Sequence, residues 1–231
     1  MLSVVTVNLN NATGLSRTLS SLKTQGDRNF QWVFMDGLSI DNSVTLANEF
    51  KRELDVVVSE PDTGIYNAMN KAIRSSVGDY ILFLNSGDVF ASSDAIEHIS
   101  KNLEGDVDLL TFGFEVRGTA RMPKPNWWRF WSLPTSHQAI VYKRSLLMDF
   151  PFDEKYRFAS DFDQFLRINA KPRYVKKINS ILVVNEQYGC DDNLEKVLAE
   201  YREVLIGNKL PKFWAWFVYA FKMKYLKAVL Q

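Results

Sequence analysis

The chain has 231 residues, of which 46% are hydrophobic and 24% charged, and this length suits one large domain, or a domain with an appendage, around a core of its own. Its 28 basic and 27 acidic side chains give a net charge of +1, which argues against nucleic-acid binding and, with the apolar content, against disorder. One cysteine, Cys190, and two histidines can form neither an internal disulfide nor a Cys/His zinc cluster.

Strand-like and helix-like segments alternate in the first half of the sequence. Runs of β-branched and aromatic residues predict strands, whereas apolar residues at helical spacing, such as Leu15, Leu19 and Leu22, predict helices. We predict strands over 2–7, 30–35, 56–59 and 80–84, and helices over 14–24, 44–50, 63–75 and 95–103. This alternation is typical of a mostly parallel α/β sheet flanked by helices.

The second half is less regular. We predict strands over 109–115, 139–142, 174–178 and 181–184, helices over 162–168 and 193–206, and a proline-interrupted stretch over 117–134. The sequence shows no repeat and no low-complexity linker. We therefore expect one domain over residues 1–206, followed by a C-terminal extension over 207–231.

Polar side chains follow several of the predicted strands, where open α/β sheets bind their ligands. They are Asn8, Asp36, Asp62, Asn85 and Asp88. Asp36 could accept hydrogen bonds from a base or ribose, or could simply belong to an Asp-Gly turn. Asp88 could hold Mg²⁺ or Mn²⁺ together with phosphate oxygens, but the residues around it also favour a plain turn.

The chain resembles the family 2 glycosyltransferases, which have the Rossmann-like GT-A fold. The resemblance covers about residues 1–185 and is closest to enzymes that build bacterial exopolysaccharides, such as colanic acid, and O-antigens. The matching segments, in order, are Thr6-Val-Asn8, Met35-Asp-Gly37 with Ser39-Ile-Asp41, the run from Glu60 to Lys71, Phe83 to Asp88, Ser136-His-Gln-Ala139, and Ala159-Ser-Asp161-Phe-Asp163.

This resemblance implies an inverting, metal-dependent, hexosyltransferase-type enzyme. It would take a sugar from a UDP- or GDP-linked donor and pass it to an oligosaccharide acceptor of bacterial surface polysaccharide synthesis. A nucleotide-sugar-binding half over 1–105 and an acceptor and catalytic half over 106–190 are implied. So are a Mn²⁺ or Mg²⁺ ligand at Asp88 and donor contacts at Asn8, Asp36, Asp62, Asn70 and Asn85.

Two positions depart from the family pattern. Where the family often has Asp-x-Asp-Asp, this chain has Asn85, Ser86, Gly87 and Asp88, so water and diphosphate oxygens would have to complete the metal shell. Asn67 stands where close relatives often carry Asp. The alternative is therefore a non-catalytic relative that binds sugar nucleotides or glycans. A dinucleotide oxidoreductase is disfavoured, because residues 8–14 lack the Gly-x-Gly-x-x-Gly turn.

Asp161 corresponds to the catalytic base of the family. A base must remove the proton of the acceptor hydroxyl as it attacks the anomeric carbon, and the start of a predicted helix favours an ionised carboxylate. The alternative is a capping box formed by Ser160 and Asp163, with Asp161 as a first-turn residue. His137 could ligate the metal, contact the diphosphate, orient the acceptor, or be purely structural.

An aromatic cluster lies between prolines at Trp127, Trp128, Phe130 and Trp131. Trp128 and Trp131 could stack on acceptor sugar rings, or the aromatic side chains could pin a loop by burial. Four basic residues in the same region would suit an anionic acceptor such as a polyprenyl-pyrophosphate-linked oligosaccharide: Arg117, Arg121, Lys124 and Arg129.

The C-terminal extension combines aromatic residues with lysines and has no acid after Glu203. Its apolar core, 213–221, is too short to span a bilayer. On a helix, Trp214, Phe217, Phe221 and Tyr225 would form one stripe. Since the N-terminus also has no basic leader, we expect no signal peptide and a cytoplasmic protein, peripheral on the inner face of the cell membrane. The alternative is a helix docked on the body or on a partner.

Overall fold

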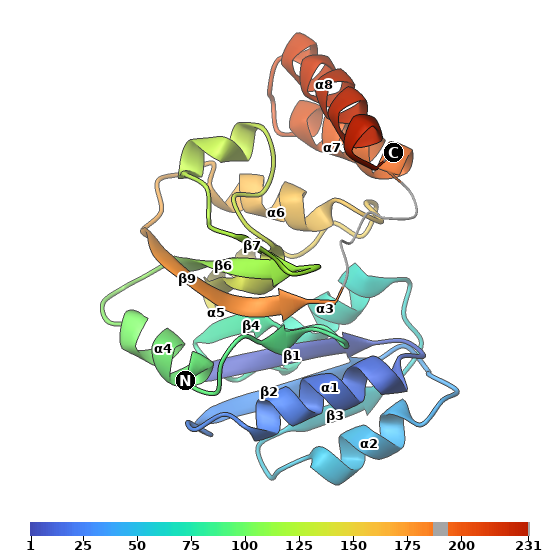
Figure 1. Ribbon diagram of the computed structural model, residues 1–231, viewed down its shortest axis with the longest axis vertical. Coiled ribbons are helices and arrows are strands. Elements are labelled where there is room, and N and C mark those ends of the chain that lie inside the picture. The colour runs from blue at the N-terminus through green and yellow to red at the C-terminus, as the bar shows by residue number, and fades with distance from the viewer. Residues whose placement is uncertain (187–193, 231) are drawn as a thin grey trace.

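One curved mixed sheet forms the centre of the computed structural model, which describes residues 1–186 and 194–230 (Figure 1). Cys190 and residue 193 of the predicted helix lie outside the described residues. The strands follow the order β3-β2-β1-β4-β8-β6-β9-β5, and β7 pairs with β6. They are β1 (Leu2–Asn8), β2 (Phe30–Asp36), β3 (Val56–Ser59), β4 (Tyr80–Phe83), β5 (Val89–Phe90), β6 (Leu109–Val116), β7 (Thr119–Arg121), β8 (Ile140–Lys143) and β9 (Val175–Asn185).

Helices cover both faces of the sheet, so the predicted α/β, GT-A-like class is confirmed. They are α1 (Ala12–Lys23), α2 (Ser43–Phe50), α3 (Ile65–Ser75), α4 (Ala95–Asn102), α5 (Arg144–Asp149), α6 (Ser160–Ile168), α7 (Leu194–Gly207) and α8 (Lys212–Leu230), with short 3₁₀ turns η1 (Asn126–Phe130) and η2 (His137–Ala139). Among the described residues no helix is long and apolar enough to cross a membrane.

The parallel part of the sheet, β3-β2-β1-β4, brings the polar strand ends together. Asn8 pairs in register with Asp36, and Asp36 with Ser59. β1 and β2 are buried along their whole length, because one core packs between the sheet and α1 and another between the sheet and α3. The predicted strands and helices of residues 1–105 are present with small shifts in their ends.

The second half of the sheet departs from the prediction at β9. The two strands expected over 174–178 and 181–184 form one strand, Val175–Asn185. The polar pair Asn179-Ser180 indicated a break in the sequence. In the structure Asn179 is exposed and the Ser180 hydroxyl contacts His98 Nε2 at 3.0 Å. β9 bulges here against β6, because the pairs Thr111–Lys177 and Gly113–Ile181 leave extra residues on β9.

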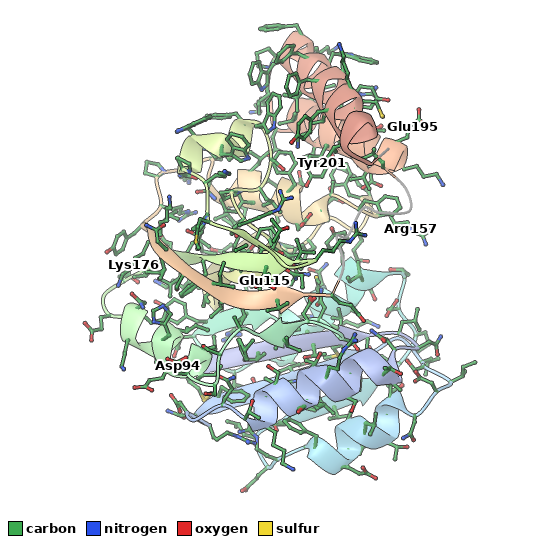
Figure 2. All side chains as sticks on the ribbon, in the orientation of Figure 1. Asp94, Glu115, Arg157, Lys176, Glu195 and Tyr201 are labelled. Carbon is green, nitrogen blue, oxygen red and sulfur yellow. The ribbon has the colours of Figure 1, made fainter. Side chains whose placement is uncertain are left out.

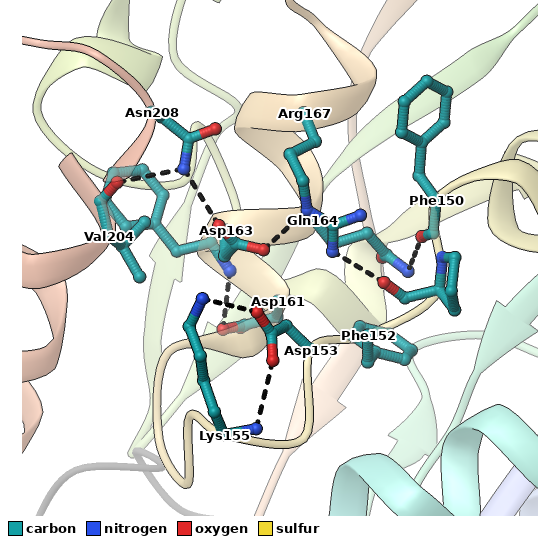
Figure 3. A network of polar contacts seen from close by, with 12 residues as sticks. Phe150, Phe152, Asp153, Lys155, Asp161, Asp163, Gln164, Arg167, Val204 and Asn208 are labelled. Atoms are coloured by element: carbon teal, nitrogen blue, oxygen red, sulfur yellow. Dashed lines mark hydrogen bonds and ion pairs between the residues drawn. The ribbon is translucent and has the colours of Figure 1, made fainter. Parts of the chain in front are cut away.

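Helices α6, α7 and α8 form a third layer above the sheet (Figure 1). Phe162 of α6 stacks on Tyr201 of α7 with ring centroids 4.7 Å apart, and α8 packs onto this pair through the buried Ala215 and Val218. The buried Asp163 of α6 binds Arg167 Nε of the same helix at 2.6 Å, and it binds Nδ2 of Asn208, the residue after α7, at 2.9 Å (Figure 3). α7 therefore holds the start of α6 in place.

Glu200 of α7 provides the closest hold on that segment. Its carboxylate accepts hydrogen bonds from three consecutive backbone N–H groups, those of Arg157, Phe158 and Ala159, at 3.0, 2.7 and 3.0 Å. These residues directly precede α6. Without the carboxylate, partly buried amides would lose their acceptor.

We predict that Glu200→Ala lowers the free energy of unfolding by about 1–3 kcal/mol, because it leaves these donors unpaired. Urea unfolding followed by circular dichroism measures the change. The matched control is Glu203→Ala, an exposed glutamate on the same helix, which should stay within about 0.5 kcal/mol of the parent. An equal effect of both substitutions would contradict the bracing role of Glu200.

Candidate active site

The ends of β1, β2 and β3 are tied together by Asp36. Its carboxylate accepts hydrogen bonds from Asn8 Nδ2 at 2.8 Å, from the Ser39 backbone N–H and hydroxyl at 2.8 and 2.5 Å, and from the Ser59 hydroxyl at 2.7 Å. Burial acts to raise the pKa of Asp36, but the hydrogen bonds from Ser39, Asn8 and Ser59 outweigh it and lower the pKa below its usual value. Asp36 is ionised at neutral pH.

This arrangement changes the role expected for Asp36. Asp36 is 2% exposed, and its two oxygens already accept four hydrogen bonds, which is about the capacity of a carboxylate. In the structure it therefore organises the strand ends, and a direct contact with a nucleoside would require one of these bonds to break. Asp62 lies in the same corner: a Cβ atom added to Gly37 would stand 2.7 Å from Asp62 Oδ2.

Asn70 also has contacts that the sequence did not indicate. Its amide group donates to Phe152 O and Glu154 Oε1, both at 3.0 Å, and accepts from Phe152 N at 2.9 Å. Glu154 additionally accepts a hydrogen bond from Asn67 Nδ2 at 2.9 Å. Asn70 and Asn67 thus anchor the segment before α6, and both polar atoms of the Asn70 side chain already take part in this anchoring.

Asp88 lies in the turn that follows β4 and is 5% exposed. Its Oδ1 accepts from the Glu186 backbone N–H at 2.9 Å, and the side chains of Asn185 and Gln138 also hydrogen-bond to it. Burial raises the pKa of Asp88 to about 6, although these hydrogen bonds act to lower it. Asp88 is thus a carboxylate whose charge state changes just below neutral pH.

The surroundings of Asp88 fit a divalent cation with few protein ligands. The described residues contain no cluster of three or more His, Cys, Asp or Glu side chains, so the donor set is limited. However, the side-chain oxygens of Asn85, in the same turn, and of Asn185, which contacts Asp88, are buried without a hydrogen-bond partner. Carboxylate and amide oxygens are the ligands that Mg²⁺ prefers. Diphosphate and water would supply the rest.

Sequence reasoning missed Glu186 and Arg17. The Glu186 carboxylate forms an ion pair with Arg17 of α1 and lies against Gly87, where any Cβ atom would collide with it. Gly87 itself has φ 104°, a conformation that favours glycine. The end of β9 is thereby fastened over the Asp88 turn. No local pattern indicates a contact between residues so far apart along the chain.

Asp161 stands in the first turn of α6 and is largely enclosed. Its Oδ1 accepts from Tyr66 OH at 3.2 Å and from the Phe162 backbone N–H at 2.8 Å. Burial raises the pKa of Asp161, opposed by His137 and by these hydrogen bonds. The helix start alone suggested a carboxylate stabilised in its charged form, and burial reverses that expectation.

The capping-box alternative does not hold. Ala159 is the N-cap residue and makes no side-chain cap bond, the Ser160 hydroxyl has no hydrogen-bond partner, and Asp163 is committed to Arg167 and Asn208. Figure 3 shows the bonds from Asp163 to Arg167 and Asn208. Asp161 belongs to no capping box, although its Oδ1 accepts the Phe162 backbone N–H of the same turn.

The turn η2 contributes neighbouring residues that interact with Asp88 and with Asp161. Gln138 contacts Asp88, and its neighbour His137 interacts electrostatically with Asp161. Burial lowers the pKa of His137 despite the charge of Asp161, so the imidazole is neutral at neutral pH and is no cationic partner for a diphosphate. Its Nδ1 is buried without a hydrogen-bond partner, and its ring lies 6.0 Å from that of Phe83. Asp88 and Asp161 thus flank one short turn.

The tryptophans in and next to η1 differ in how far they are packed against other side chains. Trp131 packs against Trp214, Phe217 and Phe221 of α8, with centroids 5.2–6.3 Å apart, so it pins the loop to α8 and is not a free platform. Trp128 lies against Trp131 and below the Lys124 ammonium. In contrast, Trp127 is 62% exposed, although its ring lies 5.6 Å from that of Trp128.

Comparison with known proteins relates the chain to one family. The model for glycosyl transferase family 2 matches residues 3–163. A PGL/p-HBAD biosynthesis glycosyltransferase of Mycobacterium bovis is 28% identical over 198 residues, which cover 80% of this chain and 76% of the relative. An uncharacterised glycosyltransferase of Mycobacterium tuberculosis is 35% identical over 104 residues, 45% of this chain and 40% of the relative.

Two solved structures share the fold. S. aureus TarS 1–349 in complex with UDP-GlcNAc has a TM-score of 0.72 at 18% identity and is matched over 95% of this chain and 70% of its own. The mannosyltransferase PcManGT from Pyrobaculum calidifontis, in complex with GDP-Man and Mn²⁺, has a TM-score of 0.66 at 16% identity, over 98% and 75%. These identities support a common fold only. Because the family model covers most of the sequence, the chain belongs to glycosyl transferase family 2.

Proposed function

We propose that this glycosyltransferase moves a hexose from a UDP- or GDP-linked donor to a lipid-linked oligosaccharide of bacterial surface polysaccharide synthesis, with inversion at the anomeric carbon. The observation that carries the proposal is the convergence of Asp88 and Asp161 on the turn η2. The solved relatives described with UDP-GlcNAc or GDP-Man support the donor class. The mycobacterial PGL/p-HBAD enzyme supports a lipid-related acceptor.

Asp161 is the proposed base of this reaction. An acceptor hydroxyl attacks the anomeric carbon, the bond from that carbon to the diphosphate oxygen breaks, and the hydroxyl proton passes to Asp161. The Tyr66 hydroxyl and the Phe162 backbone N–H both bond Oδ1 of this carboxylate, and Oδ2 is the oxygen proposed to receive the proton. A raised pKa favours proton uptake at neutral pH.

Asp88, with Asn85 and Asn185, is the proposed site for Mn²⁺ or Mg²⁺, which would neutralise charge that develops on the leaving diphosphate. Asn8, Asp36 and Asp62 frame the strand ends next to it, and we place the nucleoside against this frame. Asn70 and His137 shape the site from the side of the base. The alternative is a protein that binds sugar nucleotides or glycans without transferring a sugar. It remains open because the turn after β4 has a single carboxylate, that of Asp88.

We predict that Asp161→Asn reduces sugar transfer by at least 10²-fold, the typical contribution of a general base, while donor binding is retained. The assay is transfer from a radiolabelled nucleotide sugar with Mn²⁺, and the control is Asp149→Asn, an exposed aspartate on α5. Transfer by Asp161→Asn at the parent rate would contradict the base. If the parent protein forms no product, either with or without a chelator, this result would favour the non-catalytic alternative.

The same substitution should stabilise the protein. Since burial raises the pKa of Asp161, the ionised carboxylate costs folding free energy above the folded-state pKa, and this cost disappears below the ordinary value of 3.8. We therefore expect Asp161→Asn to melt at a higher temperature than the parent at pH 7 and at the same temperature near pH 3.5. A constant difference between the two proteins at both pH values would contradict the buried charge.

Binding of UDP with Mn²⁺ should depend on the charge of Asp88. Because the pKa of Asp88 is about 6, most molecules carry the anion at pH 7.5 and few do at pH 5. We predict that affinity falls by about tenfold between these values, as measured by isothermal titration calorimetry. Asp88→Asn should bind weakly at both. Equal affinity of the parent at the two pH values would contradict the ligand role.

A second part of the proposal concerns the membrane. Aromatic side chains of η1 and α8 remain exposed although Trp131 joins the two elements: they are Trp127, Phe130, Phe213, Trp216, Phe217, Phe221 and Tyr225. Arg129 lies over the Phe130 ring of this surface and Lys124 over the neighbouring Trp128, and the chain after Glu203 has lysines but no acids. Such a surface suits the headgroups of an anionic bilayer, here the inner face of the cell membrane.

We predict that the protein sediments with vesicles containing about one third anionic lipid and much less with neutral vesicles. Phe213→Ser, at a side chain that is 75% exposed, should weaken this partition by about tenfold, since a buried phenylalanine contributes about 1.5–3 kcal/mol. The control is Val77→Ser, 55% exposed and remote from α8 in sequence. Equal partition of all three proteins would contradict the membrane surface.

A further inference from the structure

Tyr66, in the first turn of α3, is buried at 8% exposure, yet its hydroxyl is directed at the proposed base. Its OH group donates to Asp161 Oδ1 at 3.2 Å, and its ring packs on Phe152 with centroids 5.3 Å apart. A buried hydroxyl without a partner is costly, so the contact with Asp161 satisfies both groups. Nothing in the sequence pattern separates Tyr66 from the apolar residues of the same helix face.

The hydrogen bond from Tyr66 makes the two oxygens of the Asp161 carboxylate unequal. Oδ1 receives both the Tyr66 hydroxyl and the Phe162 backbone N–H, so the carboxylate cannot turn to exchange its oxygens without losing both donors. Oδ2 is thereby presented in one orientation. An acceptor hydroxyl must meet a base oxygen at hydrogen-bond distance and in line with the anomeric carbon.

We propose that Tyr66 is a positioning residue for Asp161: its hydroxyl holds Oδ1, so that Oδ2 is aimed at the acceptor, and it stabilises the ionised carboxylate that takes the proton. This inference rests on the proposed function and extends it. Tyr66 touches no reacting atom in this scheme and acts through Asp161 alone.

The electrostatic surroundings of Asp161 support the proposal that Tyr66 stabilises the ionised carboxylate. The groups that face it are Tyr66 from α3, His137 from η2 and Tyr142 from β8, while Tyr201 of α7 acts on Tyr66. None of these is a lysine or arginine, and His137 is neutral at neutral pH. After His137 and the Phe162 backbone N–H, the Tyr66 hydroxyl is the next group that opposes the burial that raises the pKa of Asp161.

Tyr66 can keep this role over the whole working range of pH. Burial, and then the nearby charge of Asp161, raise the pKa of Tyr66 well above its usual value. The hydroxyl therefore remains a donor at any pH at which the enzyme is folded. The protonation of Asp161, and not that of Tyr66, therefore sets the pH dependence of the proposed reaction.

Tyr66→Phe tests the proposal, because it removes the hydroxyl and leaves the ring against Phe152. The pH dependence of kcat for sugar transfer is measured for parent and variant. We expect the acidic limb of the Tyr66→Phe profile to move up by about one pH unit, so that kcat at the foot of the limb falls about tenfold and recovers partly as the pH rises. KM for the nucleotide sugar should stay unchanged.

The matched control is Tyr80→Phe, which removes a hydroxyl bonded to Val107 O at 3.0 Å in another part of the sheet. It should leave the limb in place. A Tyr66→Phe profile with an unmoved limb, whether the rate falls evenly at all pH values or not at all, would overturn the proposal and leave the base assignment standing. Full transfer by Asp161→Asn would instead overturn the proposed function itself. Thermal unfolding of each variant confirms that the folded protein is compared.

Discussion

The active site depends on keeping two carboxyl groups, the buried Asp88 and the half-buried Asp161, on either side of the turn η2. Burial raises the pKa of both Asp88 and Asp161, so the folded protein pays for charges that it cannot solvate. The structure offsets part of that cost with neutral donors: Gln138, Asn185 and a backbone N–H at Asp88, and Tyr66 and a backbone N–H at Asp161. The pKa of Asp88 is raised to about 6 and that of Asp161 is raised above its usual value, which suits a cation ligand and a base.

Asp88 and Asp161 are held in place by different helices and strands. Asp88 follows a central strand and is fastened from above by the end of β9, through Glu186 and Arg17. Asp161 begins a helix that α7 holds from outside, through Glu200 and Asn208. The same α7 supports α8, whose aromatic surface we assign to the membrane. In the proposed function, the acceptor side of the site would therefore be built on the helices nearest the bilayer.

The sequence predicts the parallel half of the fold well, because β-branched runs and helical spacing are local signals. Asp88 and Asp161 could be singled out because they match family motifs at strand and helix ends. The contacts of Asp36, Asn70 and Trp131 could not be foreseen. Each depends on partners from distant segments: Ser59 for Asp36, Phe152 and Glu154 for Asn70, and α8 for Trp131. Tyr66, Gln138 and Glu186 were missed for the same reason.

The central claim, that a cation at Asp88 lies close to the turn facing Asp161, can be tested by NMR on the two histidines of the chain. Mn²⁺ added with UDP broadens nearby ring signals steeply with distance. The account predicts that His137, next to Gln138, broadens far more than His98 on α4, that Mg²⁺ does not reproduce the effect, and that Asp88→Asn abolishes it. Equal broadening of both rings, or an unchanged effect in Asp88→Asn, would contradict it.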